Sequence, residues 1–429
     1  MFPLHWYAQL LPLLRIGPTG SCSSLPVHDL TATFGSKTPL RPLPAATSKL
    51  SFSMWRLAHA IKKAECANPV LAHAPNLMAL GFILENQHLF DCSGAQFNLA
   101  DGAASYLDDF SRTGLTGRVA QGLALLQMEA AGYHFVARFD TFRKMCGVEV
   151  PKVPSRKKDS SGKPILKPIR SPDFVVEKSS GDRALVESKG SFLHSGRLGN
   201  IKGSLSDALK QLAPWGSQFS PAITKKFAIG TYLREPDVAD PEPSLLALVD
   251  PEGGQEENSA LVPSELVRKL NYAGWLDLMG YRAPARLLSS ARRLGGARET
   301  FQVADFGNSR YAYIPIALVP GPQSDELLRV LPIEPRWRGD YTMAKLRGIG
   351  AEMVVILALD AQVMERVALA SRSRDWSMLQ GESPEPDSTD FPSNRDGEDG
   401  SRFIDGSFIG IVRPQDEVVH SSEEMSLDF

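Results

Sequence analysis

The sequence is poor in cysteine and contains no apolar run long enough to span a bilayer. Its four cysteines, Cys22, Cys66, Cys92 and Cys146, lie far apart and form no CxxC pair, and no histidine stands near them at a zinc-ligand spacing. These spacings argue against a structural zinc site. Scarce cysteine also favours a reducing, cytoplasmic compartment. Residues 1–22 include a short apolar stretch but lack the basic segment of a signal peptide, so we expect neither export nor membrane insertion.

Net charge is also nearly absent, although the charges are unevenly distributed. The 429 residues are 43% hydrophobic and 22% charged, with a formal net charge of −2, which is typical of a globular protein of two or three domains. Residues 138–170 carry ten Lys/Arg against three acids, a net charge of +7, and residues 380–429 carry thirteen acids against three Arg, a net charge of −10. Such a basic segment can bind phosphates, whereas an acidic segment rich in Ser, Pro and Gly usually stays disordered.

Composition and periodicity divide the chain into five parts. We expect a poorly ordered N-terminal extension over 1–53, an α-rich region over 54–113, an α/β core over 114–252, a mixed α/β region over 260–372 that could recognise a substrate, and an acidic disordered tail over 373–429.

The core has the clearest pattern of secondary structure. Residues 114–131 have helical spacing, and Gly132 stands where a helix C-cap glycine belongs. A strand is expected over 133–142, a Pro/Lys/Ser loop over 143–170, two strands joined at "KSSGDR", a helix that starts near Ser204, and strands over 225–233 and 244–250. The pattern therefore predicts the order α-β-β-β-α-β-β.

The loop between the two strands at "DFVVEKSSGDRALVESK" decides which side chains share a face. A three-residue loop, Ser179-Ser180-Gly181, pairs Asp173 with Glu187 and places Lys189 on the same face. A loop of two or four residues shifts the register by one and separates the two carboxylates across the sheet. The alternative is an ordinary hairpin with charges that face water.

Two acids and a lysine brought together in this way suit phosphodiester hydrolysis. Asp173 and Glu187, with the backbone carbonyl of Ser188 between them, would hold a hard divalent cation such as Mg²⁺ or Mn²⁺. Such a cation lowers the pKa of bound water and stabilises charge on the phosphodiester. Lys189 would position that water or offset the developing negative charge.

Pro172-Asp173 at the start of one strand and Glu187-Ser188-Lys189 at the end of the next resemble the PD-(D/E)xK nuclease superfamily. The resemblance covers about a third of the chain and implies a restriction-endonuclease-like fold, a mixed sheet flanked by helices with an αβββαβ core. The chain adds N-terminal and C-terminal regions to that core. The resemblance also implies Asp173, Glu187 and Lys189 as catalytic residues, the two acids as metal ligands, and DNA as substrate.

Family members often carry another acid on the first helix, and this chain departs from that pattern. Gln121 stands at that position, with Glu129 two turns later. The departure favours one metal ion over two and leaves an inactive domain open. Gln211, on the helix after the triplet, is a second candidate supporting residue. Basic residues expected to contact the nucleic-acid backbone are Arg156, Lys157, Lys158, Lys163, Lys167, Lys202 and Lys210.

Three functions are consistent with these features. The first is a Mg²⁺-dependent endonuclease of bacterial restriction, repair or phage defence. The second is a catalytically inactive protein with a nuclease fold that binds nucleic acid or scaffolds a defence or repair complex. The third is an unrelated α/β protein in which the triplet is accidental. Nucleic acid is the expected partner, and a homodimer or a partner protein of a defence system stays open.

Overall fold

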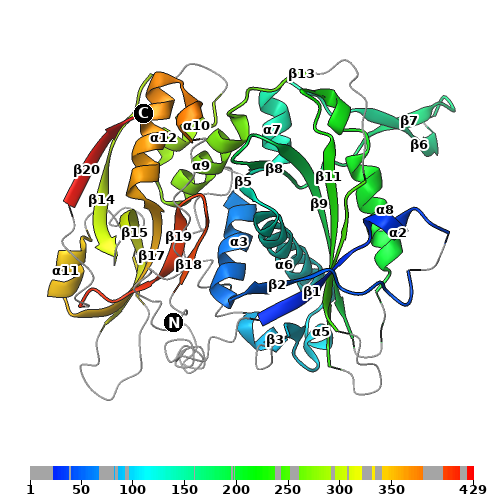
Figure 1. The fold of residues 1–429 in the computed structure, drawn as a ribbon, viewed down its shortest axis with the longest axis horizontal. Coiled ribbons are helices and arrows are strands. Elements are labelled where there is room, and N and C mark those ends of the chain that lie inside the picture. Colours follow the sequence, from blue (N-terminus) through cyan, green and yellow to red (C-terminus); the bar gives the residue numbers. More distant parts are fainter. Residues whose placement is uncertain are drawn as a thin grey trace.

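Two seven-stranded sheets with helices on their faces make up the protein, seen in the computed structural model (Figure 1). The structure describes residues 23–37, 40–66, 82, 86–91, 96–158, 160–194, 197, 199–236, 243–251, 260–290, 295–306, 309–320, 331–333, 341–379, 400–415 and 423–429. The fold is mixed α/β, as the sequence predicts.

The first sheet is curled and mixed. Its strands follow the order β2 (Ser48–Phe52), β1 (Ser23–Asp29), β12 (Leu245–Val249), β11 (Lys225–Arg234), β9 (Arg183–Leu193), β8 (Phe174–Lys178) and β5 (Tyr133–Arg138). The pairs β1/β12 and β9/β11 are parallel, and the other neighbours are antiparallel. The central strands are apolar on both faces, as expected for strands covered by helices on each side.

Helices cover both faces of this sheet. α6 (Asp109–Ala130) packs on β9 and against α3 (Met54–Cys66), and α8 (Ile201–Leu212) packs on β9 and β11. Gly190 faces α6 and the preceding Lys189 bonds to α8, so the two helices lie on opposite faces. The prediction of a glycine at the end of the first helix is confirmed, because Gly132, which follows the C-cap residue Ala131, has a φ of +86°. The start predicted for α8 is wrong: the helix begins earlier, at an N-cap formed by Asn200.

The second sheet is antiparallel throughout. Its order is β18 (Gly400–Arg402), β19 (Ser407–Val412), β17 (Ala351–Asp360), β15 (Ser309–Pro320), β14 (Arg298–Phe306) and β20 (Glu423–Asp428), with β16 (Leu331–Pro332) beside β15. α12 (Ala361–Ser373) and α11 (Met343–Gly348) pack against its strands. Between the sheets, α9 (Leu266–Leu278) contacts β5 and α3 and is followed by α10 (Arg282–Leu288).

Both ends of the chain contain more ordered structure than the sequence predicts. Within the stretch expected to be a poorly ordered extension, β1 and β2 form one edge of the first sheet. Within the expected disordered tail, β18, β19 and β20 belong to the second sheet, while residues 380–399 lie outside the described part. The prediction fails because β1, β19 and β20 pair with strands distant in sequence, β12, β17 and β14, while β2 and β18 pair in turn with β1 and β19.

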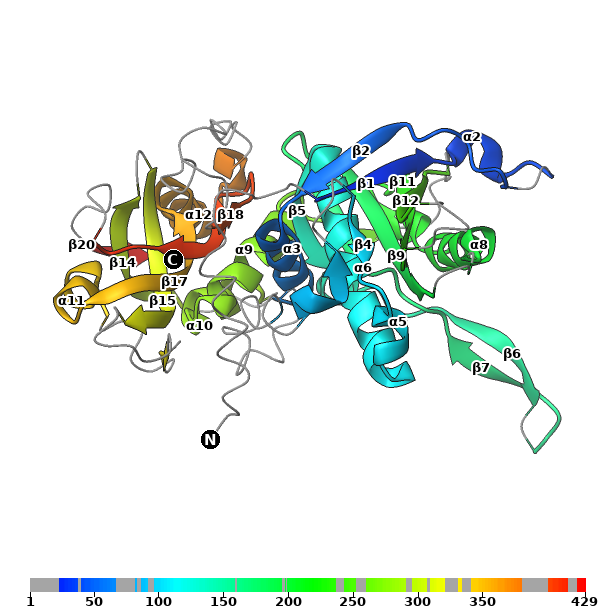
Figure 2. The same cartoon turned by 90° about the horizontal axis from the view of Figure 1, so that it is seen from below.

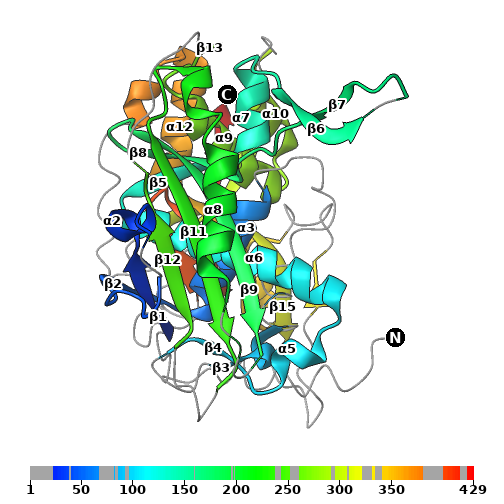
Figure 3. The ribbon, with the colours of Figure 1, turned by 90° about the vertical axis from the view of Figure 1, so that its right-hand side faces the viewer.

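The expected 143–170 loop is largely a second hairpin. β5 ends at Arg138, and α7 (Phe139–Met145) follows it. β6 (Lys152–Lys158) and β7 (Pro164–Pro168) then pair only with each other and project from the body of the molecule (Figures 2 and 3). We call this hairpin the β6–β7 ribbon.

The remaining elements are short. They are α2 (Thr31–Phe34), a 3₁₀ turn at Gln87–Leu89, β3 (Phe90–Asp91), β4 (Asn98–Leu99), α5 (Ala103–Tyr106), a 3₁₀ turn at Gly216–Gln218, β10 (Phe219–Ser220), β13 (Ala260–Leu261) and a 3₁₀ turn at Trp376–Leu379. Within the described ranges, no helix is long and apolar enough to cross a membrane.

Candidate active site

The β8–β9 hairpin has the predicted three-residue loop. Glu177 pairs with Arg183 and Phe174 with Val186, and the Gly181 N–H donates to the Lys178 carbonyl at 3.0 Å. Gly181 has a φ of +95°, the left-handed conformation that such a loop requires. The Asp173 N–H donates to the Val186 carbonyl at 3.1 Å, which continues the register and sets Asp173 opposite Glu187. The predicted register is confirmed.

A buried ion cluster fixes this loop. Glu177 is 0% exposed, and its carboxylate lies 2.7 Å from Arg183 Nε and 2.8 Å from Arg268 Nε of α9. Burial raises the pKa of Glu177, while both guanidinium groups oppose that rise. Arg268 also donates to the Ser179 carbonyl at 2.9 Å. The hairpin charge at Glu177 therefore does not face water, and α9 holds the turn that sets the register.

Asp173 accepts three hydrogen bonds. Its Oδ2 accepts from the Ser188 N–H at 2.9 Å and from the Ser188 hydroxyl at 2.7 Å. Its Oδ1 accepts from the side-chain amide of Gln121 on α6 at 3.0 Å. These donors fix the orientation of the carboxylate. Oδ2 uses both of its lone pairs, and Oδ1 keeps one. The first helix thus contributes an amide to the site.

Glu187 has one oxygen in use and one unsatisfied. The residue is 3% exposed, its Oε1 accepts from Lys189 Nζ at 2.6 Å, and its buried Oε2 has no hydrogen-bond partner. Burial raises the pKa of Glu187 to about 7, and the nearby Asp173 charge adds to the rise, which Lys189 partly offsets. A buried, unsatisfied carboxylate oxygen costs free energy unless a cation or donor meets it.

Lys189 connects this acid to α8. Its Nζ donates to Glu187 Oε1 and to Gln211 Oε1, both at 2.6 Å, and its side chain is 25% exposed. On the same helix the pKa of Asp207 is lowered, first by Lys210 and more weakly by Lys189 and Arg170. These charges therefore lie around one surface.

Sequence reasoning missed three residues near the site. Arg170 and Asp207 influence the surface beside Lys189, and Arg138 NH1 lies 3.5 Å from Gln121 Oε1. Two of them could have been found from their positions in the sequence. Arg170 stands two residues before Pro172, and Asp207 stands one helical turn before Gln211. Arg138 ends β5, and only the pairing of β5 with β8 brings it to Gln121.

The donor set suits a hard cation held by few protein ligands. Glu187 Oε2 is free to accept, and Asp173 Oδ1, which accepts one hydrogen bond, keeps one lone pair. Oxygen ligands of this kind match Mg²⁺, which keeps several waters and needs only one or two carboxylates. Within the described ranges, no three His, Cys, Asp or Glu side chains group closely enough to hold a metal ion. Asp173 and Glu187 are the two carboxylates that such a cation could use: Asp173 bonds to Gln121 of α6, and Glu187 bonds to Lys189, which Gln211 of α8 holds.

The other predicted residues occupy different places. Glu129 is not at the site: it is 6% exposed and its carboxylate pairs with Arg56 at 2.7 Å. Lys163 and Lys167 lie exposed on the β6–β7 ribbon, and Lys202 and Lys210 lie exposed on α8. The side chains of Arg156, Lys157 and Lys158 lie outside the described part of the structure.

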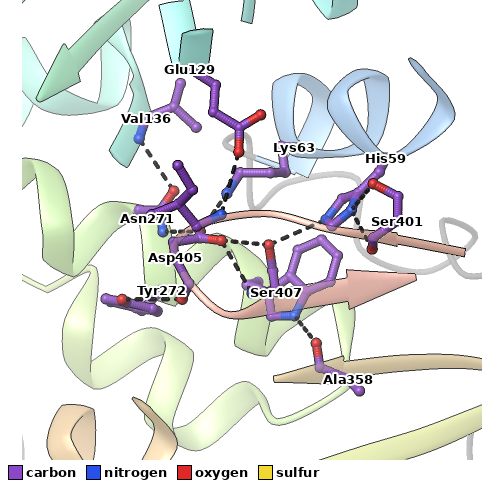
Figure 4. A network of polar contacts seen from close by, with 12 residues as sticks. His59, Lys63, Glu129, Val136, Asn271, Tyr272, Ala358, Ser401, Asp405 and Ser407 are labelled. Carbon is purple, nitrogen blue, oxygen red and sulfur yellow. Dashed lines mark hydrogen bonds and ion pairs between the residues drawn. The ribbon is translucent and has the colours of Figure 1, made fainter. Parts of the chain in front are cut away.

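A second polar cluster lies between the two sheets (Figure 4). Asp405, 1% exposed, pairs with Lys63 of α3 and accepts from Asn271 Nδ2 at 2.7 Å and Ser407 Oγ at 2.6 Å. His59 contacts Ser407 Oγ at 3.2 Å, and burial, followed by the Lys63 charge, lowers its pKa well below 6.5. These residues satisfy one another and are closed to solvent, so we assign the cluster to stability.

Comparison of the chain with protein-family models, curated proteins and solved structures finds no match.

Proposed function

We propose that the protein is a metal-dependent phosphodiesterase, an endonuclease that cleaves nucleic acid, with DNA as the first candidate. The observation that carries the proposal is the hairpin register, which sets Asp173 opposite Glu187 and leaves Lys189 bonded to Glu187 and Gln211. We place the enzyme in the cytoplasm, in restriction, repair or phage defence.

The order of elements supports a restriction-endonuclease-like core. α6, β5, β8, β9, α8 and β11 follow one another as αβββαβ, interrupted by α7, the β6–β7 ribbon, and a 3₁₀ turn with the two-residue strand β10. The four strands are adjacent in the first sheet, in the order β11-β9-β8-β5. This arrangement supports the proposal independently of the triplet, since the pairings of β5 with β8 and of β9 with β11 join separate segments of the chain.

The residues of the site divide the work of hydrolysis. Asp173 and Glu187, with the Ser188 carbonyl, would hold Mg²⁺ or Mn²⁺, which lowers the pKa of bound water and offsets charge on the phosphodiester. Gln121 orients Asp173 through its amide. Gln211 and Glu187 together fix the Lys189 ammonium, which then donates to a phosphate oxygen as negative charge develops there.

A second candidate function is a nuclease-fold protein that binds nucleic acid without cleaving it. Gln121 favours this alternative, because an amide stands where related enzymes often have an acid and it donates to Asp173. Under this alternative the three hydrogen bonds to Asp173 satisfy the carboxylate in place of a cation.

Cleavage of plasmid DNA tests the proposal. We expect the wild-type protein to nick or linearise plasmid with Mg²⁺ or Mn²⁺, and Lys189→Ala and Asp173→Asn to lose about 100-fold or more in rate, the typical cost of removing one group that stabilises transition-state charge. Lys345→Ala, an exposed lysine on α11, is the control and keeps full activity.

Two outcomes would contradict the endonuclease. Failure to cleave any DNA or RNA, single-stranded or duplex, with either metal removes the enzyme. Nucleic-acid binding without any Mn²⁺ binding in calorimetry establishes the inactive alternative.

A further inference from the structure

The β6–β7 ribbon has no structural partner of its own within the described chain. Its two strands pair with each other and with neither large sheet. Val153, Ile165 and Leu166 are 46%, 42% and 58% exposed, and every residue of β7 is exposed. A two-stranded hairpin alone in water is only marginally stable. Exposed aliphatic side chains on such an element indicate a surface that is covered in a complex.

The charge of the ribbon identifies the kind of partner. Lys152, Lys163 and Lys167 lie exposed beside the aliphatic residues. The sequence of the ribbon adds Arg156, Lys157 and Lys158 against the single acid Asp159. Lysines and arginines at this density match a polyanion such as a nucleic-acid backbone.

The root of the ribbon is anchored next to the candidate active site. The Ile169 N–H donates to the Pro151 carbonyl at 3.0 Å, and the indole of the buried Trp215 donates to the Arg170 carbonyl at 3.0 Å. Ser171 Oγ donates to Asp140 at 2.9 Å. β7 ends at Pro168, five residues before Asp173. The root of the ribbon at Pro168 therefore lies within roughly 17 Å of Asp173, the reach of five extended residues.

We propose that the ribbon enters the major groove of duplex DNA and holds the duplex against the Asp173–Glu187–Lys189 site. This inference rests on the proposed function and names its substrate class. The major groove of B-form DNA admits a two-stranded ribbon, and the methyl group of thymine there offers an apolar contact for side chains such as Leu166 and Ile165. Duplex RNA is excluded, because its major groove is too narrow and deep. Lysines flanking the aliphatic residues then meet phosphates on both sides of the groove.

DNA binding without divalent metal tests the ribbon separately from catalysis. In one variant, Asn-Gly replaces residues 153–167, which is feasible because Lys152 and Pro168 pair directly. We expect this variant to lose roughly tenfold or more in affinity for a short DNA duplex at low salt. The loss on single-stranded DNA or duplex RNA should be smaller, because there only the attraction of the deleted lysines and arginines is removed. Bulky substituents on cytosine C5 fill the major groove. They should lower the affinity of the wild type for the duplex and leave the affinity of the variant unchanged.

A charge variant and its matched control measure the phosphate contacts. Lys163→Ala/Lys167→Ala should reduce the slope of log affinity against log salt by roughly 2, since each phosphate that a lysine no longer neutralises lowers the slope by about 0.9. Lys49→Ala/Lys345→Ala removes the same charge from exposed positions on β2 and α11 and should leave the slope unchanged.

Three results would overturn the ribbon proposal: unchanged duplex affinity, an equal loss on single-stranded DNA, or conversion of a dimer to a monomer, which would identify a second copy as the occupant.

Hydrolysis of bis(4-nitrophenyl) phosphate with Mn²⁺ separates the two proposals. This small diester has no groove, so the ribbon variant should hydrolyse it at the wild-type rate. If the wild type cleaves neither this diester nor any nucleic acid, the proposed function fails while the DNA-binding result still decides the role of the ribbon.

Discussion

At the scale of single residues, the surroundings of one acid in the candidate site disfavour its ionised form. Glu187 is 3% exposed, and burial together with Asp173 raises its pKa to about 7. In the unfolded chain the same group titrates near 4.5. Below that pH it is neutral in both states and costs nothing. As the pH rises from about 4.5 to about 7, only the unfolded chain releases the proton, so the folded state loses stability.

Replacing the acid with its neutral isostere should therefore stabilise the metal-free protein at high pH. We expect Glu187→Gln to raise the free energy of unfolding by roughly 2–3 kcal/mol more at pH 8 than at pH 5, since one pKa unit corresponds to about 1.4 kcal/mol. Urea unfolding in EDTA measures the difference. Glu352→Gln, at an exposed position on β17, should behave alike at both pH values. An equal effect of Glu187→Gln at pH 5 and pH 8 would refute the assigned cause.

At the scale of elements, a close approach between α6 and β9 positions the site. A Cβ at Gly190 would lie 2.7 Å from Thr116 Cγ2 and 2.8 Å from the Thr116 carbonyl oxygen. The missing side chain lets the helix lie directly on the strand that carries Glu187 and Lys189. Gln121, on the same helix, then reaches Asp173.

Adding one methyl group at this contact should separate the two elements. Gly190→Ala is expected to destabilise the protein by about 1–3 kcal/mol through overpacking. Gly117→Ala on the same helix has open space around its Cβ and should stabilise by about 0.5–1 kcal/mol, because alanine favours the helix. Denaturant unfolding of the pair gives both values, and two changes of the same sign would show that the contact is not tight.

Sequence reasoning succeeded for local structure and failed for distant pairing. The β8–β9 register was predictable, because a glycine at the third loop position and alternating side chains fix it within seventeen residues, Asp173 to Lys189. The amide at Gln121 was predictable from helical position. The strands in the acidic C-terminal stretch were not predictable. The short apolar run of β19 stands among acidic and polar residues, and its partner β17 is a separate segment of the chain.

At the scale of the whole molecule, Asp405 joins the two sheets. It accepts from α3 through Lys63 and from α9 through Asn271, although it lies between β18 and β19 of the second sheet. Burial acts to raise its pKa, but Lys63, Asn271 and Ser407 outweigh that effect and lower the pKa to about 2. The stability it contributes is present above the unfolded pKa of 3.8 and is lost as the pH falls toward about 2.

Removing this carboxylate should weaken the attachment of the second sheet to α3 and α9. Asp405→Ala leaves a buried ammonium without its counter-charge, which typically costs about 3–5 kcal/mol. We expect a lower thermal midpoint and earlier amide exchange in α3 and α9 than in the β14–β15 pair. Asp428→Ala removes an exposed carboxylate 3.9 Å from Arg298 and should cost under about 1 kcal/mol. Equal losses in the two variants would contradict a joining role for Asp405.

The Lys63–Asp405 pair also determines when the molecule can be completed during synthesis. The two residues are 342 positions apart. At about 5–20 residues per second, the carboxylate follows the ammonium from the ribosome by roughly 17–70 s. Throughout that interval the half of the protein with the candidate nuclease site lacks the counter-charge that its buried lysine requires. A chain interrupted before residue 405 therefore contains every proposed catalytic residue but not the group that closes the fold around them.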